Sequence, residues 1–272
     1  MKSQIEWFRC AFAATLLCMA VAPQLHAGTS VLIWPLDPTI EADQRAASIW
    51  LENVGNELVT LQIRVLGWNQ HGYQDDYSAQ QGIIATPPFT KIAAGNRQLV
   101  RLTMLQPASP GREQAYRILV DEIPVARAVE DSAAQRPAGA LRFQMRYSLP
   151  LFVYGAGLRS ENSSAARHSS VQRAQPQLSW SIDETEAERY LYVRNSGSGH
   201  ARLSRVRLNP VASQSAGSPA DAMSIDVAAG LLGYVLPGTQ MRWPLTSGPI
   251  PDGYSLQAQL RSNSEPVSIL LE

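Results

Sequence analysis

The side chains that could perform chemistry in this chain are few and scattered. Outside the first 27 residues the histidines are His71, His168 and His200, and none has metal-like spacing to another ligand. Neither a Gly-x-Ser-x-Gly nucleophile elbow nor a Gly-rich phosphate loop ending in Gly-Lys occurs. Asp75-Asp76 could bind a cation, but its Gly-, Tyr- and Gln-rich surroundings favour a solvated loop. The sequence predicts no enzyme, no metal and no cofactor.

A second kind of chemistry, strand pairing, has a clear candidate. Between Ala140 and Leu149 apolar and polar residues alternate, with Leu141, Phe143, Met145, Tyr147 and Leu149 on one face. This period of two is typical of a half-buried β-strand. A row of large apolar side chains suits a sheet edge that receives a strand from another protein. It also suits an internal strand that packs into its own core, and the pattern alone leaves both readings open.

Charge and cysteine content narrow the class of protein. The 272 residues carry 23 basic and 23 acidic side chains, so nothing favours a nucleic acid or an anionic membrane as partner. Residues 1–27 read as a secretory signal peptide, with Lys2 and Arg9 before a short apolar core. Cys10 and Cys18 lie in this segment, so the exported chain would have no disulfide. No later stretch is apolar enough to span a membrane, and we expect no stable membrane insertion.

The elements that must position these residues are short strands. Glycine and proline number 18 each and are spread widely, as in all-β proteins with many turns. Strand patterns recur in residues 28–154, and a second β-rich segment occupies residues 155–272 after a Ser-, Ala- and Arg-rich stretch over Gly155–Gln177 that reads as a linker. The expected fold is all-β, with two immunoglobulin-like β-sandwich domains. Tandem domains of this kind place a cleft between them.

Three ordered motifs in the first domain resemble a known family. They are the run Ile83–Leu102, with Ala-Thr-Pro-Pro near its start and Val-Arg-Leu at its end; Tyr116–Pro124, with Tyr-Arg at its start and Glu-Ile-Pro at its end; and the alternating strand Leu141–Leu149. In this order they are similar to the periplasmic chaperones of chaperone–usher pili. The second domain, around Gly230–Gly238, looks like the divergent archaic branch. The resemblance implies an L-shaped arrangement of the two domains and a location in the periplasm.

The resemblance also implies a mechanism. Chaperones of this family lend their seventh strand to an incomplete pilus subunit, a process called donor-strand complementation, and then deliver the subunit to an outer-membrane usher. The donor residues here would be Leu141, Phe143 and Met145, with Tyr147 as a weaker candidate. Pilus subunits and the usher are thus the expected partners. Whether the free chaperone caps its own edge in an oligomer stays open.

This chain departs from the best-studied branch at the site that anchors the subunit's terminal carboxylate. Val31 and Pro150 stand where that branch carries an arginine and a lysine. A carboxylate in a partly dry cleft needs a cation or several amide donors. Arg117 is the first candidate because it interrupts an apolar strand, and Arg101 and Arg127 are second choices. Equally, Arg117 could face solvent or pair with Asp121.

Two further expectations concern the domains and the class. Glu122 matches the family's acidic residue that ties the two domains together, although the partner position holds Tyr154. The alternative function is a secreted two-domain adhesin or a fimbrial structural protein. A pilus subunit would have one incomplete sandwich, whereas the first domain here reads as complete.

Overall fold

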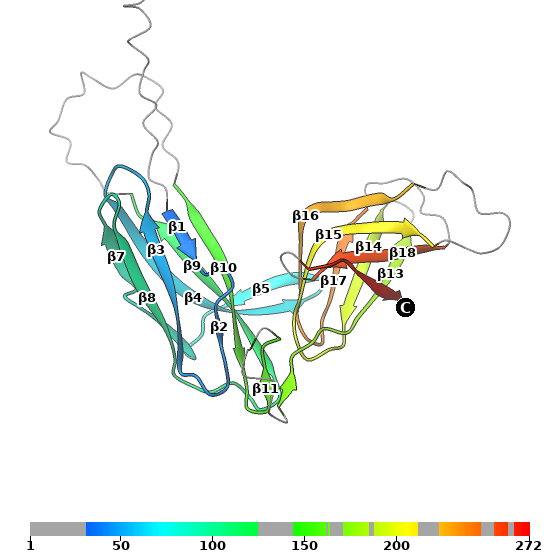
Figure 1. Cartoon of the computed structure of the whole chain (residues 1–272), viewed down its shortest axis with the longest axis horizontal. Coiled ribbons are helices and arrows are strands. Elements are labelled where there is room, and N and C mark those ends of the chain that lie inside the picture. The colour runs from blue at the N-terminus through cyan, green and yellow to red at the C-terminus, as the bar shows by residue number, and fades with distance from the viewer. Residues whose placement is uncertain are drawn as a thin grey trace, which may run out of the picture.

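The structure is a computed structural model. It describes residues 31–124, 144–161, 163, 171–184, 188–211, 223–245, 253–260 and 264–272. In these ranges the chain folds as β-strands joined by turns, and two β-sandwiches meet at an angle to give an L-shaped molecule (Figure 1). The predicted fold class is confirmed.

The first sandwich is formed by two sheets. One has the strand order β1-β3-β8-β6, and the other has the order β2-β10-β9-β4-β5, with β7 pairing to β4. The strands are β1 (Val31–Trp34), β2 (Thr39–Ile40), β3 (Ala46–Asn53), β4 (Val59–His71), β5 (Gln74–Ser78), β6 (Ile83–Thr86), β7 (Phe89–Ile92), β8 (Arg97–Met104), β9 (Glu113–Glu122) and β10 (Arg146–Tyr154).

The second sandwich has the strand order β16-β15-β18-β19-β13-β14-β17. Its strands are β13 (Leu178–Glu184), β14 (Arg189–Asn195), β15 (Ala201–Pro210), β16 (Ile225–Val235), β17 (Gln240–Pro244), β18 (Tyr254–Gln259) and β19 (Val267–Leu271). Strand β19 joins its two layers, because it pairs antiparallel with β18 and parallel with β13.

Alternation along the strands builds a separate core in each sandwich. In β4 the residues Leu61 and Ile63 are buried and the arginine between Ile63 and Val65 is exposed, as a strand with one wet face requires. The first core is lined by residues such as Ile49, Leu102 and Ile118, and the second has its own cluster around Trp180 and Leu203. Each domain therefore buries its own apolar face.

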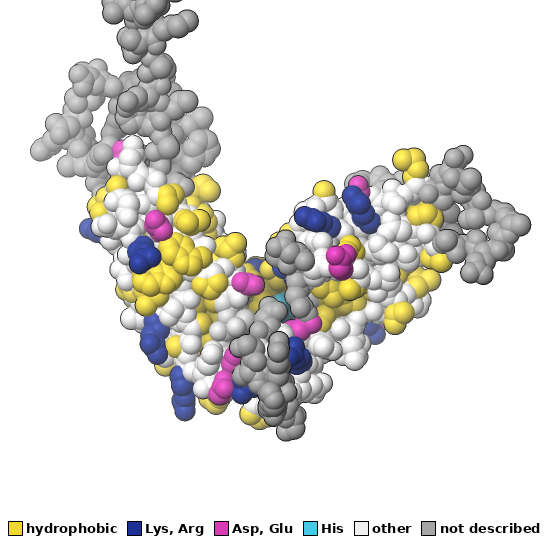
Figure 2. All heavy atoms as spheres, in the orientation of Figure 1, with side chains coloured by type: hydrophobic (Ala, Val, Ile, Leu, Met, Phe, Trp, Pro, Cys, Tyr) yellow, Lys and Arg dark blue, Asp and Glu magenta, His cyan; other side chains and the backbone are white. Residues whose placement is uncertain are grey.

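A third, smaller cluster joins the domains. It contains Trp68, Phe152, Tyr154 and Leu158 from the first domain and the chain just after it, together with Leu236 from the second. Figure 2 shows an open notch between the two domains, with hydrophobic side chains on both of its walls. Aromatic packing at the bottom of this notch holds the domains at their angle.

Three segments differ from the sequence expectation. The strand expected to end at Leu149 continues as β10 through Pro150 to Tyr154. Asp75-Asp76 lies in strand β5 and not in a solvated loop. The stretch read as a linker contains a short parallel pair, β11 (Leu158–Arg159) and β12 (Gln172–Arg173), and Leu158 is buried.

Candidate functional site

Strand β10 has one satisfied edge and one open edge. It pairs with β9 along its whole length, from Arg146 opposite Asp121 to Tyr154 opposite Glu113. On the other side it pairs with β2 only at Phe152 and Val153, and no strand in the described ranges pairs there with residues 146–151. Unpaired backbone N–H and C=O groups on an edge are a template for another strand.

Proline at position 150 fits this geometry. Pro150 lies opposite Arg117 in the ladder with β9. A proline lacks the N–H that a central strand would have to donate, so it is tolerated at a sheet edge. Strand β10 can therefore continue through Pro150, where no described strand pairs with its other side.

The apolar row that precedes and enters β10 divides into two parts. Tyr147 packs against the first core, its hydroxyl accepts a hydrogen bond from the Val31 amide at 3.4 Å, and Leu149 is fully in the core. Met145 is 44% exposed although it is large and apolar. Leu141 and Phe143 lie outside the described residues. The row thus leaves its own core at Met145, at the beginning of the strand.

Arg117 lies in the notch between the domains. Its guanidinium carbon is 3.8 Å from the centroid of the Trp68 ring, 5.9 Å from that of Tyr77 and 5.4 Å from that of Tyr234. Its Nε is buried without a hydrogen-bond partner among the described residues. Burial raises the pKa of both tyrosines, while the charge of Arg117 opposes part of this rise. Both phenols are therefore neutral. The rings of Trp68, Tyr77 and Tyr234 contact the Arg117 guanidinium without neutralising its positive charge.

The other proposed role for Arg117, pairing with Asp121, is wrong. Asp121 accepts hydrogen bonds from Arg64 Nη2 at 2.7 Å and from Arg146 Nε, and Arg117 is in none of the ion pairs of the described residues. Burial works to raise the pKa of Asp121, but the two arginines together hold it below its usual value. Side chains at residues 117 and 121 share a face, but Arg146 lies directly across from Asp121 on β10, and Arg64 on β4 reaches it from the position opposite Leu119.

Of the two second-choice arginines, Arg101 does not join Arg117. Arg101 is exposed on β8, in the other sheet, where it pairs in register with Ser48 and Thr86. Arg127 lies outside the described residues. Within the described chain, Arg117 is thus the sequence-predicted anchor candidate that reaches the notch.

The long hairpin of β4 and β5 crosses from the first domain to the second (Figure 1). Its turn is Gly72-Tyr73, and both residues have positive φ, 57° and 65°, as a two-residue type I′ turn requires. The Tyr73 ring meets Tyr192 of the second domain edge-on at 5.3 Å. Across this hairpin Trp68 lies opposite Tyr77 and Gln70 lies opposite Asp75, a pairing that the sequence analysis did not identify.

The acidic tie between the domains is Glu113 and not Glu122. Glu122 lies at the far end of β9, next to Met145, whereas Tyr154 pairs with Glu113. The Glu113 side chain is 1% exposed, and its Oε1 is 3.0 Å from both the backbone N and the ring Nδ1 of His200. Burial, followed by the negative charge of Glu113, raises the pKa of Tyr154, so this phenol stays neutral. The motif match chose the wrong end of the strand because two glutamates, Glu113 and Glu122, bracket it.

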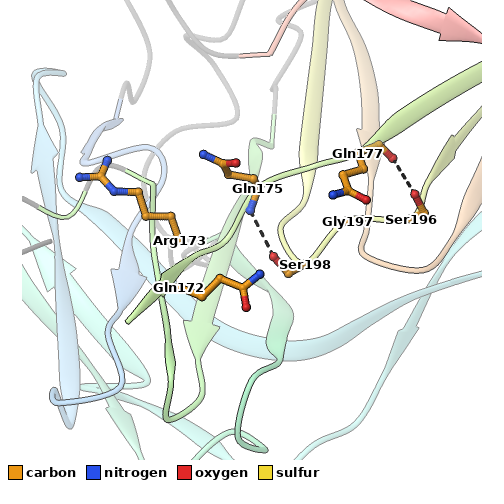
Figure 3. Close-up of a pocket in the computed structure, with 7 residues that line it drawn as sticks. All are labelled: Gln172, Arg173, Gln175, Gln177, Ser196, Gly197 and Ser198. Atoms are coloured by element: carbon orange, nitrogen blue, oxygen red, sulfur yellow. Dashed lines mark hydrogen bonds between the residues drawn. The ribbon is translucent and has the colours of Figure 1, made fainter. Parts of the chain in front are cut away.

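A polar hollow of about 430 Å³ lies beside the junction and does not look like a binding site. Its walls already bond to one another: the Gln175 amide donates to Ser198 Oγ, and Ser196 Oγ donates to the Gln177 carbonyl (Figure 3). The lining residues are Gln172, Arg173, Gln175, Gln177, Ser196, Gly197 and Ser198. The hollow is best explained as the place where the connecting chain packs on a turn of the second domain.

The described ranges hold no cluster of three or more His, Cys, Asp or Glu side chains suited to a metal. None of the described segments forms a helix long and apolar enough to cross a membrane.

Comparison with known proteins finds one matching family model and several similar solved structures. Residues 38–159 match the family model for the pili and flagellar-assembly chaperone, PapD N-terminal domain. The crystal structure of the CsuC–CsuE chaperone–tip adhesion subunit pre-assembly complex, from archaic Csu pili of Acinetobacter baumannii, matches at 32% identity with a TM-score of 0.66. That match covers 89% of this chain and 99% of the other. No curated protein sequence matches the chain.

More distant structures share the fold. The Salmonella enterica SafB chaperone complex with SafA pilin matches at 16% identity and a TM-score of 0.54, over 90% of this chain and 98% of that one. The CupB2 chaperone of Pseudomonas aeruginosa matches at 16% identity and a TM-score of 0.52, over 87% and 97%. The match at 32% identity supports the family that the motifs resemble and not the adhesin alternative. The chain belongs to the pilus-assembly chaperones of the chaperone–usher pathway.

Proposed function

We propose that the segment Leu141–Tyr147 is the strand that this chaperone lends to pilus subunits. Leu141, Phe143 and Met145 would enter the groove of the subunit, with Tyr147 at the boundary between that groove and the chaperone's own core. The observation that carries the proposal is the open edge of β10 together with the exposure of Met145, the last apolar residue before the row enters the core.

The energy of this contact is sufficient for capture. Burying one large apolar side chain contributes roughly 1.5–3 kcal/mol. Three or four such residues contribute about 5–10 kcal/mol before the cost of ordering two strands is subtracted. Backbone ladder bonds would supply affinity for any subunit, and the spacing of the apolar residues would fix the register, because a slip of one residue turns the row outward.

Arg117 is proposed to bind the terminal carboxylate of the subunit. Its Nε–H is a donor without a partner, and its stacking on Trp68 holds the guanidinium plane fixed. A planar fork of donors matches a carboxylate in two parallel hydrogen bonds. This arrangement would replace the arginine and lysine whose positions hold Val31 and Pro150 in this chain.

The wider setting follows from the family. We propose that residues 1–27 are a signal peptide removed on export to the periplasm, that residues 28–154 and 155–272 are the two domains, and that an outer-membrane usher receives the loaded chaperone. This function requires no catalysis, since exchanging the lent strand for another strand replaces one set of backbone hydrogen bonds with an equivalent set. The free protein could cap its own open edge by pairing with a second copy.

The test of the lent strand is co-expression of the chaperone with a secreted pilus subunit. We expect Phe143→Glu and Met145→Glu to abolish recovery of the chaperone–subunit complex, because a carboxylate cannot enter an apolar groove unpaired. Phe89→Glu is the matched control, since Phe89 is 55% exposed on β7, away from β10. Undiminished recovery with both donor-strand variants would disprove the proposal.

A further inference from the structure

The Arg117 site is built from both domains, and one glutamine connects them. Gln70 on β4 is 6% exposed although it is polar. Its Oε1 accepts hydrogen bonds from the Leu236 amide at 2.8 Å and from Thr239 Oγ1 at 2.7 Å, and its Nε2 donates to the Tyr234 carbonyl at 2.9 Å. The side chain therefore joins the crossing hairpin to three groups of the second domain.

The same amide group also bonds to Asp75, the carboxylate that holds two of the aromatic rings around Arg117. Gln70 Nε2 donates to Asp75 Oδ1 at 2.9 Å, and Trp68 Nε1 donates to the same oxygen at 2.8 Å. The hydroxyl of Tyr77 donates to the other oxygen of Asp75 at 3.1 Å. Because Trp68 and Tyr77 flank the guanidinium, the Asp75 carboxylate sets the position of two of its three aromatic neighbours.

The third aromatic neighbour is set by the second domain. Tyr234 supplies the ring 5.4 Å from Arg117 and also the carbonyl that Gln70 holds. Its ring packs edge-on against Trp68 at 5.3 Å. If the second domain moved away, Arg117 would lose the Tyr234 ring directly, and Gln70 would lose the three partners that fix its side chain beside Asp75.

We propose that Gln70 is a positioning residue that couples domain docking to carboxylate binding: Arg117 is ready for a chain-terminal carboxylate only while Gln70 holds the second domain. This inference rests on the proposed role of Arg117. Its consequence is a chaperone whose affinity for the end of a subunit depends on the angle between its domains. A change of that angle would then weaken the hold on the carboxylate before the lent strand is exchanged.

The test measures binding of a small carboxylate to the full chain by NMR. The probes are N-acetylalanine and its amide, and the signals are the Arg117 Nε–H and the Trp68 indole N–H. Two variants loosen the connection, Gln70→Ala and the milder Thr239→Val, which removes one donor from Gln70 Oε1. Gln80→Ala is the control, since Gln80 also bonds to the backbone through both amide atoms, at Val65 and Ile83, but within the first domain.

We expect the wild-type chain to prefer the acid to the amide, and both loosening variants to raise the dissociation constant for the acid about tenfold, within the usual range of coupling between sites. The control should bind as the wild type does. Unchanged affinity for the acid in both variants would overturn the role of Gln70 while leaving Arg117 in place. Equal affinity of the wild type for acid and amide would instead overturn the assignment of Arg117, and the role of Gln70 with it.

Discussion

Arg117 owes its suitability as an anchor to what surrounds it. An arginine on the surface gains little from one more carboxylate, because water already solvates it. Here the guanidinium is stacked on Trp68 in a notch, and its Nε is buried without an acceptor. A carboxylate that enters such a site completes a hydrogen bond that water does not supply.

The stacking of Arg117 on Trp68 allows a test that separates the charge of this side chain from its planar shape. Arg117→Lys keeps the charge but loses the planar fork and the face that rests on Trp68. We expect recovery of the chaperone–subunit complex to fall about tenfold, and the free energy of unfolding to fall by about 1 kcal/mol, the usual size of a cation–π contact. Pull-down and urea unfolding measure the two effects.

Arg101→Lys is the control for this prediction, because Arg101 is exposed on the other sheet. It should leave both quantities at wild-type values. Full recovery of the complex with Arg117→Lys would mean that any positive charge in the notch suffices and that the fork is not used.

At the scale of elements, the two domains share a feature that their sequences hardly reveal. We call it the asparagine corner: a buried asparagine at the end of a strand, bonded to a glycine turn. Asn53 ends β3 and Asn195 ends β14, and both are fully buried. Each backbone bonds to a turn with a positive-φ glycine, Gly95 in the first domain and Gly238 in the second. The shared signal is only Asn-x-Gly followed some 40 residues later by a glycine turn, too sparse to be read as a repeat.

The asparagine corner predicts that replacing its asparagine lowers the stability of either domain by a similar amount. The Asn53 amide donates to the carbonyls of Glu57 and Ile92, and its oxygen accepts from Gly55. Asn195 likewise donates to Gly199 and Val235. We expect Asn53→Ala and Asn195→Ala each to destabilise its own domain by about 3 kcal/mol, because buried backbone groups lose their partners.

Differential scanning calorimetry with each variant measures this cost. Asn209→Ala, at a half-buried position near the end of β15, should change little. If only one of the two corner variants is destabilising, the corners resemble each other in geometry but not in energetic weight.

The beginning of β10 is held by charge, which makes it sensitive to acid. Arg64 and Arg146 keep the pKa of Asp121 below its usual value, so their stabilisation is complete above the pKa of the unfolded chain and is lost as the pH falls through the lower folded pKa. The contribution is about 1 kcal/mol or less, because the Arg64 and Arg146 side chains are 42% and 64% exposed.

Comparing Asp121→Asn with the wild type tests this contribution. We expect the variant to be less stable to urea at pH 7, and the difference to shrink as the pH falls below about 4, where Asp121 of the wild type loses its own charge. A difference that stays constant with pH would show that Asp121 acts through its shape and not through its charge.

What the sequence predicted at this scale was local. Recurring strand patterns over residues 28–154 predicted an all-β first domain, because period two is imposed by each strand itself. The contacts that make the notch could not be predicted in this way: Gln70 and Tyr234 are 164 residues apart, and nothing in either neighbourhood marks a partner. Arg117 was predicted because a charge in an apolar strand is conspicuous, whereas Asp75 looked like part of a polar loop.

At the scale of the whole molecule, two polar contacts join the domains in addition to the aromatic packing at the bottom of the notch. One is the Gln70 connection at the crossing hairpin, and the other is the pair Glu113 and His200 beside the linking segment. The His200 ring also stacks on Phe152, with centroids 3.4 Å apart and planes within 5°. Phe152 belongs to β10, so this second contact joins the second domain directly to the strand that carries the open edge.

The stacked histidine therefore predicts a change in shape rather than in fold. His200→Ala would leave the core of each sandwich intact, since His200 lies in neither core. The substitution removes the ring that stacks on Phe152. It also removes one hydrogen-bond partner of the almost fully buried Glu113 carboxylate. Because a buried charge without its partner is costly, the interface should open to admit water to Glu113. We expect small-angle scattering to show a larger radius of gyration and calorimetry to show two separate transitions, whereas the same substitution at exposed His71 should change neither. An unchanged scattering profile would mean that the Gln70 connection and the aromatic contacts of the crossing hairpin set the angle without His200.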